Sequence, residues 1–157
     1  MAGYRGDWPL MRWRFVDRVT AFEPWRLAEG VKALSLEEYS LYEPLGRKGV
    51  APESLVLETC VHLLRWLVMR SSDFSQTCLL AQIDAFSFAR EVGMGDVLVI
   101  FVTVVRQDGG RLAAECRVRC RDQSVARGVL TVELLDLAEA LDPELAQATW
   151  RELYAAP

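Results

Sequence analysis

The sequence predicts an α+β fold in which an antiparallel sheet wraps around one long central helix. The segment from Pro52 to about Arg70 is apolar in almost every direction around a helix, which indicates a buried helix. Extended segments flank it in the sequence, two before it and four after it. Strands segregated from a single helix are typical of the α+β class.

Two strands are expected before the helix. Residues 12–22 alternate well enough for a strand, and residues 26–36 can return beside it after a turn at Glu23-Pro24-Trp25. Residues 37–50 are rich in turn-forming residues and predict a loop. Loops of this size often carry functional groups.

The central helix is expected to begin at Pro52 and to end at Ser71-Ser72-Asp73. Proline suits the first helical position because its missing N–H has no partner to lose there. The helix contains one carboxylate in its apolar stretch, Glu58, and a buried carboxylate is costly unless it is paired or used.

Four extended segments follow the helix, separated by turn signals at Gly93–Asp96, at Gln107–Gly110 and at Asp122-Gln123. A final helix is predicted from Asp142-Pro143, a capping residue before a first-turn proline, with Leu145, Ala148 and Leu153 on its apolar face. The four segments are residues 77–90, 97–106, 111–121 and 124–135.

Composition excludes several function classes. The chain has 157 residues, 52% of them hydrophobic, which fits a single globular domain. Its net charge of -4 with scattered arginines argues against nucleic acid as the main ligand. The longest uncharged apolar stretch, residues 97–105, is too short to cross a membrane, so a cytoplasmic location is expected.

Metal and cofactor sites are not expected. The four cysteines, at positions 60, 78, 116 and 120, have no Cys-x-x-Cys spacing, and the chain has one histidine. We interpret the cysteines as reduced structural thiols.

Three ordered motifs resemble the hotdog-fold 3-hydroxyacyl-acyl-carrier-protein dehydratases of fatty acid synthesis. Residues 15–19 with Glu23-Pro24 resemble the family's first strand, a hydrophobic pair followed by Asp-Arg-Val and Glu-Pro. Residues 51–58 resemble its Met-Pro-Gly-Val-Leu-x-x-Glu helix start, and residues 92–96 resemble its Val-x-Pro-Gly-Asp turn. The resemblance implies a hotdog fold, with a core over residues 9–135 and a helical extension over residues 136–157 of one domain.

The resemblance also implies a chemistry. In the family a histidine removes the proton next to the thioester carbonyl, and an acidic residue on the helix protonates the departing hydroxyl. The acidic residue corresponds to Glu58. The histidine position, eight residues before the helix proline, corresponds to Pro44, and the family's glycine after that proline corresponds to Glu53. The resemblance therefore implies a member whose dehydratase chemistry has diverged or been lost.

Further candidates surround Glu58. Helical spacing puts Glu58, His62 and Arg65 on one stripe, which is either part of an acyl-thioester pocket or the helix's solvent face. His62 could act as a base or give structural support. Candidate substrate-binding residues are Glu53 and Ser54 at the helix start, and Arg47 and Lys48, which could hold a phosphopantetheine phosphate or simply be solvated.

Three functions follow from this interpretation. The first is a dehydratase-like protein that binds acyl thioesters, on acyl carrier protein or coenzyme A, in fatty acid or polyketide-type lipid metabolism. The second is an acyl thioesterase that uses Glu58, and the third is a non-catalytic hotdog partner subunit. The resemblance implies a homodimer or a trimer of dimers, because the family's pocket forms between two subunits, with neither cofactor nor metal.

Overall fold

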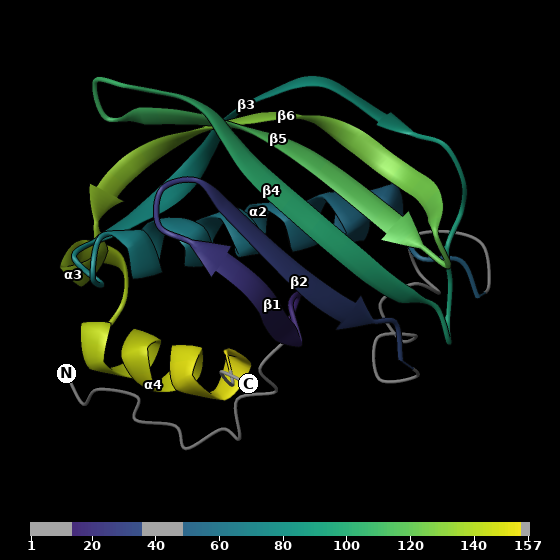
Figure 1. Cartoon of the computed structure of the whole chain (residues 1–157), viewed down its shortest axis with the longest axis horizontal. Coiled ribbons are helices and arrows are strands. Elements are labelled where there is room, and N and C mark those ends of the chain that lie inside the picture. The colour runs from purple at the N-terminus through teal and green to yellow at the C-terminus, as the bar shows by residue number, and fades with distance from the viewer. Residues whose placement is uncertain (1–13, 36–48, 155–157) are drawn as a thin grey trace, which may run out of the picture.

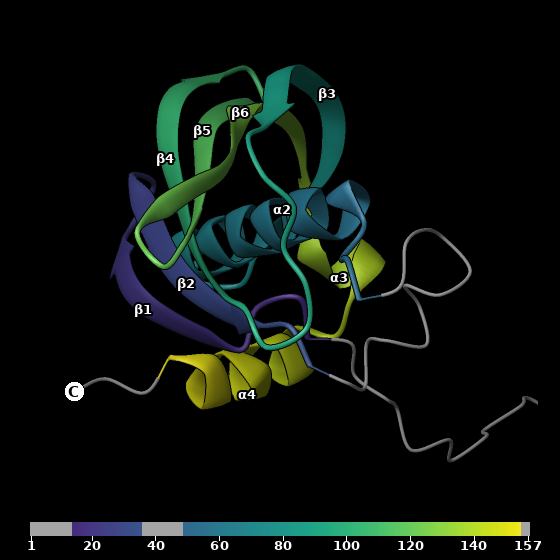
Figure 2. The same ribbon diagram turned by 90° about the vertical axis from the view of Figure 1, so that its right-hand side faces the viewer.

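The computed structural model describes residues 14–35 and 49–154, and it contains one antiparallel sheet curved around a long helix (Figures 1 and 2). The six strands of the described residues lie in the order β1-β2-β4-β5-β6-β3. The elements in chain order are β1 (Arg18–Glu23), β2 (Leu27–Ala33), α2 (Glu53–Ser71), β3 (Gln76–Phe88), β4 (Val97–Asp108), β5 (Arg111–Cys120), β6 (Gln123–Asp136), α3 (Leu137–Ala140) and α4 (Pro143–Leu153).

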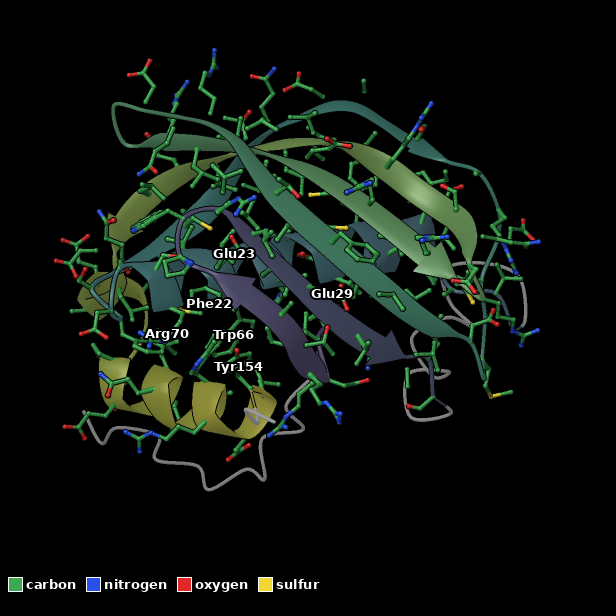
Figure 3. All side chains as sticks on the ribbon, viewed as in Figure 1. Phe22, Glu23, Glu29, Trp66, Arg70 and Tyr154 are labelled. Atoms are coloured by element: carbon green, nitrogen blue, oxygen red, sulfur yellow. The ribbon has the colours of Figure 1, made fainter. Side chains whose placement is uncertain are left out.

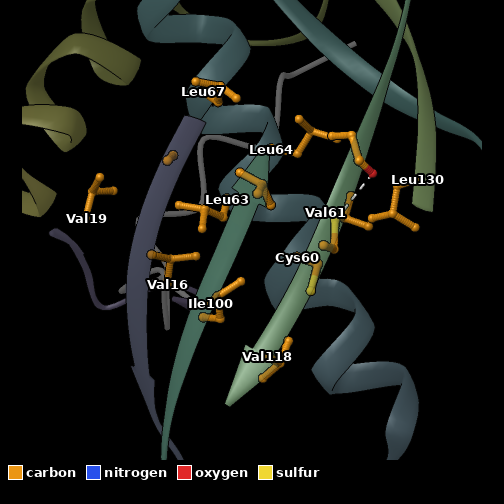
Figure 4. Packing of buried hydrophobic residues seen from close by; sticks show 14 of the residues in the cluster. Val16, Val19, Cys60, Val61, Leu63, Leu64, Leu67, Ile100, Val118 and Leu130 are labelled. Atoms are coloured by element: carbon orange, nitrogen blue, oxygen red, sulfur yellow. Dashed lines mark hydrogen bonds between the residues drawn. The ribbon is translucent and has the colours of Figure 1, made fainter. Parts of the chain in front are cut away.

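Helix α2 lies along the concave face of the sheet, and this contact forms the core. Leu63 and Leu64 of α2 are fully buried, as is Ile100 of β4, and Figure 4 shows these side chains packed together. Alternate residues of β5 point toward the helix, from Leu112 to Cys120. Burial of apolar side chains at about 1.5–3 kcal/mol each is the main force that holds α2 against the sheet.

The first strand begins later than predicted. The sequence predicts a strand from residue 12, whereas β1 starts at Arg18, and residues 12–13 lie outside the described residues. The reason is Asp17, whose carboxylate accepts a hydrogen bond from the Ala33 backbone N–H at 2.7 Å and lies 3.3 Å from the Lys32 ammonium. Asp17 therefore fixes the entry of the chain into β1 by binding the far end of β2.

Strand β3 forms one edge of the sheet and carries exposed apolar side chains. Leu80 and Ile83 pair with Val132 and Leu130 of β6, which are fully buried, so all four point to the concave face. Leu80 and Ile83 are nevertheless 38% and 46% exposed. The monomer thus leaves an apolar strip along the edge strand beside α2.

Helix α4 packs against β1 and α2 through aromatic contacts. The Trp150 ring lies 5.3 Å from the Phe22 ring and 6.1 Å from the Trp66 ring, measured between centroids. Figure 3 shows Phe22, Trp66 and Tyr154 gathered between α4 and the rest of the fold. The predicted apolar face was partly wrong: Leu145 and Ala148 are exposed, and the buried residues are Ala146, Trp150 and Leu153.

The described residues contain no helix long and apolar enough to span a membrane. All four cysteines are free and buried.

Candidate functional site

The start of α2 is held in place by the turn at residues 92–96. The Ala51 N–H donates to the Val92 carbonyl at 2.8 Å, and Val50 forms a bridge with Gly93. A Cβ at position 93 would lie 2.0 Å from the Gly49 carbonyl oxygen, so only glycine permits this approach. Asp96 stabilises the turn by accepting the Gly93 N–H at 3.0 Å.

Helix α2 presents one incompletely covered stripe. Glu58, His62 and Arg65 are half-buried, whereas Thr59, Cys60 and most other residues of the middle turns are buried. The Arg65 guanidinium donates to the Cys78 carbonyl of β3 at 3.4 Å, so the Arg65 end of the stripe lies against β3. The three residues of the expected stripe therefore share the same half-buried state, and Arg65 connects the stripe to β3.

Glu58 has one oxygen that is buried and lacks a hydrogen-bond partner. This oxygen is Oε2, and no described residue donates to it. A buried polar atom without a partner costs about 1–3 kcal/mol, and more when it is charged. Such an atom can accept a hydrogen bond from a ligand, or exchange a proton with one, without first breaking a contact within the protein.

His62 lies one helical turn after Glu58 and is packed against an aromatic ring. The Phe15 ring lies 4.5 Å from the imidazole, between centroids. Burial, together with the positive charge of Arg65, lowers the pKa of His62 from 6.5 to about 4. The imidazole is therefore neutral at pH 7 and weakly basic.

The remaining predicted site residues are either exposed or lie outside the residues that the structure describes. Glu53 and Ser54 are exposed at the first turn of α2, where backbone N–H groups carry the positive end of the helix dipole. Arg47, Lys48 and Pro44 lie outside the described residues. Among the described residues, no group of three or more His, Cys, Asp and Glu side chains is placed to hold a metal ion.

Sequence reasoning missed Phe15 as a neighbour of the site. Phe15 is 47 positions before His62, and its contact depends on how the segment before β1 passes α2. Phe15 belongs to the family-like motif at residues 15–19, which predicts a strand but does not predict which side chains Phe15 contacts.

Comparison with known proteins identifies the family. The chain is 30% identical over 122 residues to the 3-hydroxyacyl-acyl-carrier-protein dehydratase FabZ of Natranaerobius thermophilus, an alignment that covers 77% of this chain and 86% of that protein. The chain belongs to the 3-hydroxyacyl-acyl-carrier-protein dehydratase family. No family model matches the sequence of this dehydratase-family member.

Solved structures confirm that this dehydratase-family chain has the hotdog fold. A hot-dog-like protein from Thermanaerovibrio acidaminovorans superimposes with a TM-score of 0.62 at 16% identity, covering 86% of this chain and 96% of that one. A hypothetical thioesterase from Streptococcus pneumoniae, solved with coenzyme A, gives a TM-score of 0.59 at 13% identity, covering 76% and 85%. At these identities the likeness concerns the fold alone.

Proposed function

We propose that the protein binds acyl thioesters at the Glu58 stripe and that Glu58 contacts the reacting part of the acyl chain. The observation that carries this proposal is the buried, unpartnered Oε2 atom of Glu58. A structural carboxylate would be expected to use both oxygens within the protein, because leaving one unpaired is costly. A bound hydroxyacyl group would supply the missing donor.

Dehydration is the reaction that family membership favours, with Glu58 as the acid that protonates the departing hydroxyl. The family's histidine base has no counterpart at its usual position in this chain. The sequence has Pro44 at the corresponding family position and one histidine, His62. With a pKa of about 4, His62 is a weaker base than an ordinary imidazole, which predicts slow dehydration. His62 then acts chiefly as a neutral side chain one helical turn from Glu58, which adds no positive charge near the carboxylate at pH 7.

Thioester hydrolysis is the second candidate. It is supported by the thioesterase-like neighbour solved with coenzyme A and by the lone carboxylate of the stripe, which can act as a base toward water. A non-catalytic partner subunit would bind the thioester and catalyse neither reaction. The thioester carrier in each of these functions would be acyl carrier protein or coenzyme A.

A second copy of the chain is proposed to complete the site. Leu80 and Ile83 face the concave side and remain exposed at the β3 edge, the strand whose Cys78 carbonyl accepts from Arg65 of the half-buried stripe. Unpaired strand edges with apolar side chains invite pairing with another chain. A homodimer joined at β3 would cover the exposed Leu80 and Ile83 side chains and the half-buried stripe of α2. Three such dimers could assemble into a trimer of dimers.

Two assays on the same preparations test this proposal. One measures hydration of a crotonyl thioester, and the other measures thiol release from acyl-CoA and from acyl-loaded carrier protein. Either activity should fall at least about 100-fold in Glu58→Gln, since the amide cannot transfer the proton. Glu139→Gln, an exposed change on α3, is the matched control and should retain full activity. An activity that Glu58→Gln leaves unchanged would remove Glu58 from the mechanism.

A further inference from the structure

Two arginines face each other on the outer side of the sheet. Arg117 of β5 and Arg127 of β6 are register partners. The neighbours of Arg117 in the chain, Cys116 and Val118, are fully buried against the core, so Arg117 and Arg127 point to the opposite, convex face. Directly opposed like charges destabilise a sheet, which makes this pair unusual unless something compensates it.

Nearby carboxylates compensate this charge weakly. The Arg117 Nε atom lies 3.8 Å from the Glu115 carboxylate, a distance at the limit of an ion pair. Arg127 forms no ion pair with any carboxylate in residues 14–35 and 49–154. The pair therefore forms a local positive patch on a chain whose net charge is -4.

The patch borders a hollow large enough for a small ligand. The hollow has a volume of about 340 Å³ and is lined by Phe101, Arg117, Val118, Arg119, Ser124 and Arg127. A second hollow of about 360 Å³ shares Ser124 and Arg127 with it. Volumes of this order are typical of small-molecule sites.

One wall of the hollow also orients a guanidinium group. The Arg117 Cζ atom lies 5.8 Å from the centre of the Phe101 ring, within the range of a cation–π contact. Phe101 is the register partner of Arg117 on β4, so Phe101, Arg117 and Arg127 form one row across three strands. The ring holds Arg117 in place, whereas Arg127 stays available to a ligand.

We propose that this row binds a phosphate ester or diphosphate, with Arg117 and Arg127 as the charged donors and Ser124 as a hydroxyl donor. Guanidinium groups match phosphate oxygens in a two-pronged geometry, and a bound dianion relieves the repulsion between the two arginines. The site lies on the face of the sheet opposite to α2. It is therefore a second site, distinct from the proposed thioester site, and it does not depend on Glu58.

Calorimetric titration of the full-length protein tests the site, with inorganic pyrophosphate and with ADP as separate ligands. Both should bind the wild type, and the Arg117→Gln/Arg127→Gln double variant should bind them at least tenfold more weakly. Arg151→Gln, an exposed change on α4, is the control and should bind within twofold of the wild type. Tighter binding of ADP than of pyrophosphate would identify a nucleotide as the source of the phosphate, whereas equal affinity would identify the phosphate groups alone.

Three results would overturn the proposal. The first is competition by sodium chloride as effective as that by sulfate at equal ionic strength, which would mean nonspecific screening. The second is an equal loss in Arg151→Gln and in the double variant. The third is a failure of pyrophosphate to bind, together with binding of acyl carrier protein that is lost in the double variant. That result would make the face a protein-docking surface. Removing the like-charge pair should leave the melting temperature unchanged or raise it. If the double variant does not fold, the affinity of Arg127→Gln for pyrophosphate is measured instead.

Discussion

Gly93 lies directly against Gly49, so closely that a Cβ atom at position 93 would be 2.0 Å from the Gly49 carbonyl oxygen. This contact joins the turn before β4 to the segment that leads into α2. The family-like turn at residues 92–96 and the family-like helix start at residues 51–58 are therefore one structural unit. The turn positions the helix that carries Glu58.

Substituting Gly93 should consequently weaken the whole site. We expect Gly93→Ala to lower the free energy of unfolding by about 1–3 kcal/mol, because backbone atoms must move to admit the methyl group. Chemical denaturation measures this change. Met94→Ala, which alters a 48% exposed side chain in the same turn, should have little effect. Equal stability of the two variants would contradict the close approach.

The buried imidazole of His62 predicts a pH dependence of stability. The unfolded chain takes up a proton at His62 near pH 6.5, whereas the folded chain does so only near pH 4. The free energy of unfolding should therefore fall by up to about 3 kcal/mol as the pH drops from 6.5 to 4. Below pH 4 this group adds no further loss.

Comparison with His62→Gln isolates that contribution from the carboxylates that titrate in the same range. The unfolding free energy of the wild type minus that of His62→Gln should decrease by up to about 3 kcal/mol as the pH falls from 6.5 to 4. Parallel stability curves would show that the imidazole is not held neutral.

The aromatic cluster predicts a strong dependence on the last helix. Trp150 is 6% exposed and contacts the rings of Phe22, Trp66 and Tyr154. Trp150→Ala should lower the free energy of unfolding by about 3–5 kcal/mol, and Trp150→Phe should lower it by less. Denaturation curves of both variants measure this. A loss below about 1 kcal/mol in Trp150→Ala would mean that α4 is not docked on the fold.

The proposed dimer predicts an effect of charge at the sheet edge. Ile83→Lys should convert the dimer to a monomer, because the ammonium group would be buried at the β3 edge without a partner. Sedimentation analysis reports the mass directly. Leu145→Lys, at a 38% exposed position on α4, should remain a dimer. A wild-type monomer, or a dimeric Ile83→Lys protein, would contradict assembly through β3.

The sequence predicts the central elements well because their patterns are local. The alternation in β5 and the apolar run of α2 each follow from side-chain periodicity, and both elements end close to the predicted positions. The start of β1 was predicted too early because the Asp17 carboxylate binds β2, a tertiary contact that alternation does not encode.

The candidate site was predictable only in part. Helical spacing correctly places Glu58, His62 and Arg65 on one stripe, but it does not predict that Phe15 covers His62 or that Arg65 reaches the Cys78 carbonyl. In α4 the buried face depends on the rings of Phe22 and Trp66, which are distant in the sequence. The neighbours of the α2 stripe and the buried face of α4 both depend on packing between segments that are far apart in the sequence.

The most direct test of the central claim measures whether Glu58 recognises the hydroxyl group of a bound acyl chain. Calorimetry would compare unreactive thioether analogues of 3-hydroxybutyryl-CoA and butyryl-CoA on the wild type and on Glu58→Leu. We predict that the wild type binds the hydroxylated analogue about tenfold more tightly, as expected for one hydrogen bond to a buried carboxylate. The preference should disappear in Glu58→Leu. An equal preference in both proteins, or no binding of either analogue to the wild type, would contradict the assignment of this site.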